Sequence, residues 1–241
     1  MSQTQITAEF LGELAEVEAA LLGAAQELGA PLGELVRAHI LRNAPLLRAA
    51  LVLTIAAGDH EDVELRKKRI LLAGALEMLH IAMHVHRLLL ESTPHFGNNG
   101  ESADYQDRTF MGGAILAGDY CFSRAAQMAA RTDNPTVVKV FARTLQAVSE
   151  GQLRRHFEAD TAHPLDELRE LLQAGATAAA ALADLDPDAT QAARDLGEEV
   201  ARRWEHPADA LNQEPAAPQF NRQPVLLRWL ADQPHNGRSV P

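Results

Sequence analysis

The sequence is poor in cysteine and in aromatic residues. Cys121 is the only cysteine among 241 residues, which excludes an internal disulfide framework and fits a reducing compartment. Aromatic residues make up 5% of the chain, and β-branched or aromatic runs between turn residues are scarce, so a large β-sheet is not expected. Abundant Ala and Leu instead predict an all-α protein. The length and the 46% hydrophobic content allow one sizeable core in a single domain.

Positive charge is also in short supply. The chain has 22 Lys and Arg against 33 Asp and Glu, a formal net charge of −11, which disfavours nucleic acid and anionic membranes as partners. The one basic run, residues 66–69, is interpreted as the solvated start of a long helix, with a diphosphate or partner contact as the alternative. The N-terminus lacks the basic and apolar segments of a signal peptide, so a cytoplasmic location is expected.

No membrane span is expected either. The apolar stretch Leu71–Leu90 has the length of a span, but it contains polar side chains such as Glu77 and Arg87 that would be costly in hydrocarbon. It is apolar over most of its circumference from Ile70 onward, which is typical of a helix surrounded by other helices.

Helical spacing of apolar residues divides the chain. Thr7 is a plausible N-cap of the first helix, and Asp186 before Pro187 is a good cap for the last long one. Residues 92–107 lack an apolar period and are expected to form a loop. Residues 1–212 are assigned to one helical domain, and residues 213–241 to a Pro-rich tail with one short helix at 225–230. The helices are expected at about 8–28, 35–57 with a bend or break near Pro45, 62–91, 109–131, 135–158, 165–185 and 187–206.

Two stretches resemble a known family. Gly113–Ala126, GAILAGDYCFSRAA, resembles the A-I-L-A-G-D-x-L-x-x-x-A helix of the trans-prenyl diphosphate synthases, including the Gly118-Asp119 pair. Leu47–Gly58 resembles the helix that follows the G-K-x-x-R-P motif of that family, and Arg48 stands at the position of its arginine. The lysine and the proline of that motif are absent.

The helix Gly74–Glu91 shows both the resemblance and its limit. In the family it reads E-x-x-H, six further residues ending in His, then D-D-x-x-D, and the aspartates bind magnesium that holds an allylic diphosphate. Glu77, His80 and His86 fall in register. The aspartate positions carry Arg87, Leu88 and Glu91. Because magnesium requires hard oxygen ligands, this first motif is read as degenerate.

The second aspartate-rich motif of the family aligns with Gly197–Asn212. Ala208 and Asn212 stand where two aspartates are expected, and only Asp209 is retained. Both magnesium sites therefore appear in degenerate form, and no catalytic residue is assigned. Magnesium is expected only in an active partner subunit. The resemblance implies a helical bundle of the isoprenoid synthase type with a truncated C-terminal part.

The resemblance implies a non-catalytic or regulatory subunit of a heteromeric polyprenyl diphosphate synthase, in a homo- or heterodimer with an active prenyl diphosphate synthase. Arg48 and His80 match family residues that bind the homoallylic diphosphate, so a vestigial site for a prenyl diphosphate stands beside a structural role for both. One alternative is a divergent prenyltransferase with altered metal chemistry, in which Arg87 replaces one metal. Another is a stand-alone isoprenoid-binding or scaffold protein.

A metal site is a competing interpretation of the same helix. Glu77, His80 and His84 form E-x-x-H-x-x-x-H, which places three possible ligands on one helical face. Carboxylate-bridged metal bundles need a second such helix, and the nearest candidates do not reproduce the pattern: Glu150, His156 and Glu158. A structural role is therefore favoured and no metal is predicted. His86 lies two residues after His84 and is therefore expected to face a different side of the helix.

Overall fold

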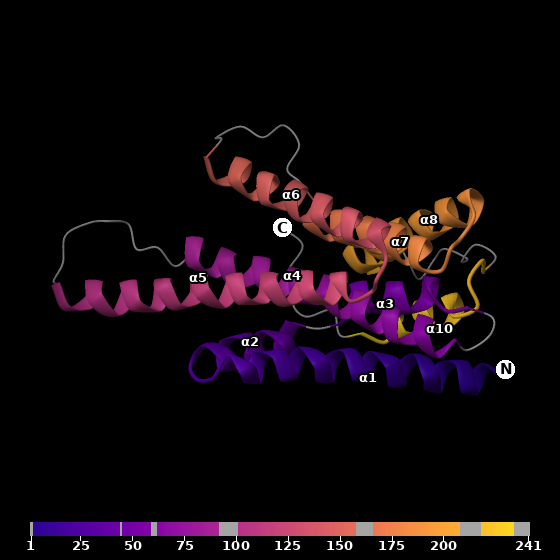
Figure 1. Cartoon of the computed structure of the whole chain (residues 1–241), viewed down its shortest axis with the longest axis horizontal. Coiled ribbons are helices and arrows are strands. Elements are labelled where there is room, and N and C mark those ends of the chain that lie inside the picture. The colour runs from indigo at the N-terminus through magenta and orange to yellow at the C-terminus, as the bar shows by residue number, and fades with distance from the viewer. Residues whose placement is uncertain are drawn as a thin grey trace.

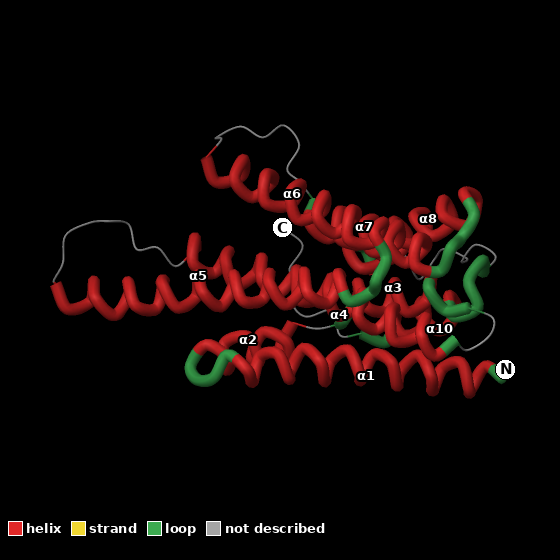
Figure 2. The backbone as a smooth tube through the Cα atoms, viewed as in Figure 1, coloured by secondary structure: helices red, strands yellow, loops and turns green. Residues whose placement is uncertain are grey.

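Helices make up most of the part of the chain that the structure describes. The computed structural model describes residues 2–43, 45–58, 62–91, 101–157, 166–207 and 218–233, and these ranges contain helices but no strand (Figure 2). The prediction of an all-α protein is confirmed. The helices are α1 (Gln3–Glu27), α2 (Leu32–Asn43), α3 (Leu47–Ile55), α4 (Val63–Glu91), α5 (Glu101–Ala130), α6 (Pro135–Phe157), α7 (Glu167–Leu182), α8 (Pro187–Glu205) and α10 (Gln223–Ala231).

Several predicted boundaries are confirmed, but the predicted start of the first helix is wrong. The break near Pro45 separates α2 from α3, and the Asp186 carboxylate accepts the N–H of Ala189 at 2.8 Å as the cap of α8. The first helix does not start after Thr7. Ser2 caps α1 by accepting the N–H of Gln5 at 3.3 Å, while the Thr7 hydroxyl bonds back into the helix. The apolar period begins later than the helix because its first turn is polar and exposed.

The predicted loop over residues 92–107 is wrong from Glu101 onward. α5 begins there, and residues 92–100 lie outside the described ranges. Figure 1 shows the first turns of α5 extending beyond the rest of the bundle. A helix segment with few neighbours needs no apolar stripe, so the period that marks a buried helix is missing from its sequence.

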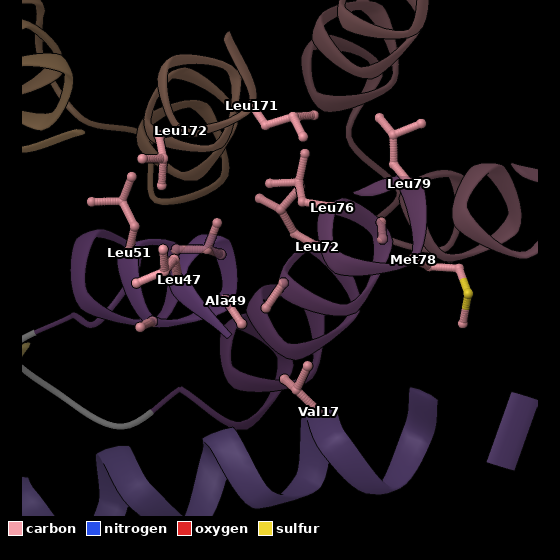
Figure 3. Close-up of a cluster of buried hydrophobic side chains, with 14 of the residues drawn as sticks. Val17, Leu47, Ala49, Leu51, Leu72, Leu76, Met78, Leu79, Leu171 and Leu172 are labelled. Atoms are coloured by element: carbon pink, nitrogen blue, oxygen red, sulfur yellow. The ribbon is translucent and has the colours of Figure 1, made fainter. Parts of the chain in front are cut away.

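The core is built around α3 and α4. All nine residues of α3 are buried, and α4 packs against α1, α3, α5 and α7, as its apolar circumference predicted. Figure 3 shows how leucines of three helices meet, with Leu51 of α3 facing Leu172 of α7 and Leu76 of α4 facing Leu171. Each fully buried leucine contributes about 1.5–3 kcal/mol relative to exposure.

An ionic cluster is buried between α1, α4 and α10. The Glu13 carboxylate accepts hydrogen bonds from Arg69 Nε at 2.9 Å and from Arg222 Nη1 at 2.8 Å, and the three side chains are only 1–6% exposed. Burial alone would raise the pKa of Glu13, but the two guanidinium groups outweigh it and lower that pKa. Interpreting residues 66–69 as a solvated run is therefore wrong for Arg69, which ties α4 to α1.

The predicted short helix near the C-terminus is α10. Its Val225, Leu226 and Leu230 are buried, and the helix packs against α1, α3 and α8. Residues 218–233 thus belong to the same packed bundle, while the boundary proposed at residue 212 stays a prediction. None of the helices in the described ranges combines the length and the low charge needed to cross a bilayer.

Candidate functional site

The first half of the site is a buried ion pair at the start of α3. Glu77 Oε1 accepts the backbone N–H groups of Arg48 at 2.9 Å and of Ala49 at 3.0 Å, and Oε2 accepts Arg48 Nη1 at 3.0 Å. The first N–H groups of a helix have no partner within it, and they carry partial positive charge. Glu77 of α4 therefore caps α3 and neutralises Arg48 with one carboxylate.

The second half joins the end of α4 to the first residue of α7. His80 Nδ1 lies 3.1 Å from Glu167 Oε1, and Arg87 Nη2 donates to Glu167 Oε2 at 2.7 Å. His80 and Arg87 are two helical turns apart, so they share one face of α4. Burial alone would raise the pKa of Glu167, but His80, Arg87 and Arg48 outweigh it and lower that pKa. Glu167 was not singled out in the sequence, because nothing local links it to the helix 80 residues earlier.

Histidines gather beside this contact. The ring of His39, from α2, stacks on His84 with centroids 4.0 Å apart and lies 5.8 Å from His80. Burial, together with the charges of neighbouring histidines and arginines, lowers the pKa of His39 to about 3. Burial and the charge of Arg48 also lower the pKa of His80. His39 was not predicted as a site residue, because its only signal in the sequence is a polar residue on the buried side of a short amphipathic helix.

The metal interpretation finds no support in this geometry. Glu77 is held by Arg48, His80 by Glu167, and His84 lies flat against His39. Within the described part of the chain, no group of three His, Cys, Asp or Glu residues could hold a metal ion. The three possible ligands share a helix face, yet each contacts a different neighbouring group.

His86 faces α5, as predicted. Its Nε2 lies 3.3 Å from the carbonyl oxygen of Ile115 and 3.5 Å from the exposed Asp119 carboxylate, and its ring packs against Phe122. A Cβ at Gly118 would overlap the His86 ring. The Gly118-Asp119 pair thus allows α4 and α5 to approach closely.

The positions of the two expected aspartate motifs are only partly described by the structure. Arg87 has its partner in Glu167, and Leu88 and Glu91 lie in the last turn of α4, although their side chains are outside the described set. The remaining positions fall between the described ranges: Ala208, Asp209 and Asn212. The loss of the second aspartate motif therefore stays a prediction from the sequence.

Comparisons with known proteins agree with this architecture. No family model matches the chain. It is 30% identical over 151 residues to a prenyl transferase of Cyanophora paradoxa, covering 58% of this chain and 45% of that protein. It is 29% identical over 118 residues to a prenyl transferase of Synechocystis, covering 48% of this chain and 36% of that protein. The chain thus spans less than half the length of these curated relatives.

Solved structures show the same fold. A polyprenyl synthase from Caulobacter crescentus, complexed with calcium and isoprenyl diphosphate, superposes with a TM-score of 0.61 at 20% identity, over 87% of this chain and 65% of that one. A heptaprenyl diphosphate synthase from Staphylococcus aureus gives a TM-score of 0.63 at 17% identity, over 84% and 65%.

The fold is therefore that of the helical isoprenoid synthases. The sequence similarity to curated prenyl transferases agrees with this fold.

Proposed function

We propose that this chain is a non-catalytic or regulatory subunit of a heteromeric polyprenyl diphosphate synthase, and that it pairs with an active prenyl diphosphate synthase. One observation carries the proposal. Where the resemblance expects a metal-binding aspartate, Arg87 stands ion-paired to Glu167 at 2.7 Å. A cation held by an internal carboxylate cannot bind the magnesium that a departing diphosphate requires.

The remaining polar groups of the site support the same function. Arg48 is paired with Glu77, and His80 is paired with Glu167. Both residues match diphosphate ligands of the family, and both already have a carboxylate partner within this chain. Their contacts also hold α3 and α7 against α4. In this chain, residues that match substrate ligands act as packing residues, which is consistent with a subunit kept for its surface and shape.

A single purification and assay tests this function. The chain is mixed with a prenyl diphosphate synthase from the same organism, and association is followed by size-exclusion chromatography with light scattering. We expect a complex, a changed rate or product length of the active synthase, and no product from this chain alone with magnesium and isoprenyl diphosphates.

Two results would contradict the proposal. Product formed by this chain alone would favour the divergent prenyltransferase, in which Arg87 replaces one metal. Failure to associate with or affect any synthase of the organism would favour a stand-alone isoprenoid-binding or scaffold protein. An Arg87→Ala variant separates these outcomes further, because it should abolish activity only in the divergent enzyme.

A further inference from the structure

The Glu167 carboxylate lies beside positive and proton-bearing side chains, where an anion from solution could also bind. It comes from the first residue of α7 and contacts two side chains of α4, His80 at 3.1 Å and Arg87 at 2.7 Å. The charge of Arg48, at the start of α3, also acts on this carboxylate. Two side chains of α4 thus direct a positive and a proton-bearing group toward one carboxylate of α7.

The Glu167 carboxylate leaves one donor of Arg87 unused. Among the described residues, Arg87 Nε has no hydrogen-bond acceptor, although this nitrogen is shielded from solvent. Buried guanidinium N–H groups normally find an acceptor. A larger oxyanion has more acceptor oxygens than a carboxylate and can bind an arginine in the bidentate manner that Glu167 does not use.

The contact is also accessible from outside. The side chains of His80, Arg87 and Glu167 are 24%, 33% and 13% exposed. Ion pairs that reach solvent contribute little net free energy, about 0–1 kcal/mol. A multiply charged solute could therefore compete with Glu167, whereas it could not compete with Glu77 in the buried pair with Arg48.

We propose that Glu167 is a built-in competitor that closes an oxyanion site formed by His80 and Arg87, and that removal of its carboxylate opens this site to a diphosphate group. Glu167 then acts as an autoinhibitory residue. The inference rests on the proposed function for the class of anion, but it does not involve the partner subunit. A failure to bind a synthase would therefore leave it intact.

The test is the binding of inorganic pyrophosphate to the whole chain without magnesium, measured by isothermal titration calorimetry. We expect Glu167→Ala to bind pyrophosphate at least about tenfold more tightly than the unaltered protein, which corresponds to 1.4 kcal/mol. Glu170→Ala is the matched control, because it removes an acid from the same turn of α7 but keeps the Glu167 carboxylate. It should leave the affinity unchanged.

A double variant locates the anion. Glu167→Ala combined with Arg87→Ala should lose the gained affinity. Equal binding by the unaltered protein and Glu167→Ala, or retained tight binding in the double variant, would overturn the proposal. If Glu167→Ala does not fold, as judged by circular dichroism, Glu167→Gln replaces it, since Gln keeps the size and removes the charge.

A second titration tests whether the site prefers a prenyl diphosphate or the free pyrophosphate anion. Glu167→Ala is titrated with an isoprenyl diphosphate beside pyrophosphate. Tighter binding of the prenyl ester supports a site within a prenyl-binding cavity, and equal binding supports a site for the free anion. Binding of neither compound would contradict the proposal.

Discussion

Glu77 and Arg222 bind opposite ends of the same helix. Glu77 accepts the first N–H groups of α3, and Arg222 Nη1 donates to the carbonyl oxygen of Leu53 in its last turn at 3.2 Å. The N-terminus of a helix carries partial positive charge and the C-terminus partial negative charge. All nine residues of α3 are buried, so side chains from elsewhere in the chain satisfy ends that water would otherwise reach.

Removing Arg222 should destabilise the protein. Arg222→Ala leaves Glu13 with Arg69 as its remaining buried arginine and leaves Leu53 without its guanidinium donor, so we expect a loss of about 3 kcal/mol in the free energy of unfolding. Chemical denaturation followed by circular dichroism measures it. Arg228→Ala, on the exposed side of α10, is the control; an equal loss in both variants would show that the ion cluster is not the cause.

The charge of Glu77 should matter separately from its shape. Glu77→Gln can still accept the N–H groups of α3, but it leaves Arg48 without a countercharge, and we expect a cost of about 2 kcal/mol. Glu77→Ala also removes the cap and should cost about 3–5 kcal/mol. The order of unfolding midpoints should be unaltered protein, then Gln, then Ala. Equal midpoints for Gln and Ala would mean that the cap contributes nothing.

Two glycines should respond in opposite directions to the same change. A Cβ at Gly33 would overlap the backbone carbonyl of Ala25, whereas a Cβ at Gly23 has no atom within 4 Å among the described residues. We expect Gly33→Ala to destabilise by about 1–3 kcal/mol. Gly23→Ala should stabilise α1 by about 0.5–1 kcal/mol, because alanine restricts the unfolded chain. Differential scanning calorimetry of both variants checks the signs, and a stabilised Gly33→Ala would contradict the packing of α1 on α2.

Stability should fall as the pH drops below the ordinary pKa of histidine. Burial and the neighbouring positive groups lower the pKa of His39 to about 3 from its ordinary value of 6.5, so between these two pH values the unfolded state binds the extra proton. The free energy of unfolding therefore decreases on acidification, by up to about 1.4 kcal/mol per pH unit for this group. His80, whose pKa is also lowered, adds to the slope.

The histidine contribution can be isolated between pH 6.5 and 5, where carboxylates change little. His39→Gln stays neutral throughout and should flatten the slope of unfolding free energy against pH measured by urea denaturation. His206→Gln, which replaces a histidine at the exposed end of α8, should leave it unchanged. An unaltered slope in His39→Gln would show that burial among His84, His80, Arg48 and Arg87 does not keep His39 neutral.

The local pattern of residues determined most of the helices of this protein, although it missed the first turns of α1 and α5. Apolar spacing predicted the buried circumference of α4, Pro45 predicted the break between α2 and α3, and Asp186 predicted the start of α8. These features depend on residues within a few helical turns of one another, so they can be predicted from the sequence. The resemblance to the family rests on the same kind of local pattern, carried by residues such as Arg48 and His80.

Only the tertiary structure decided which charges meet. Glu167 reaches Arg87 across 80 residues, and Arg222 reaches Glu13 across 209. No local pattern specifies such pairs, because a charged side chain is suited equally to solvent and to a distant countercharge. A buried charged side chain cannot contact solvent and therefore needs a countercharge, and the packing of the helices decides which side chains are buried. The sequence therefore determined most of the helical segments, and packing determined that Arg87 is neutralised by a carboxylate of the same chain.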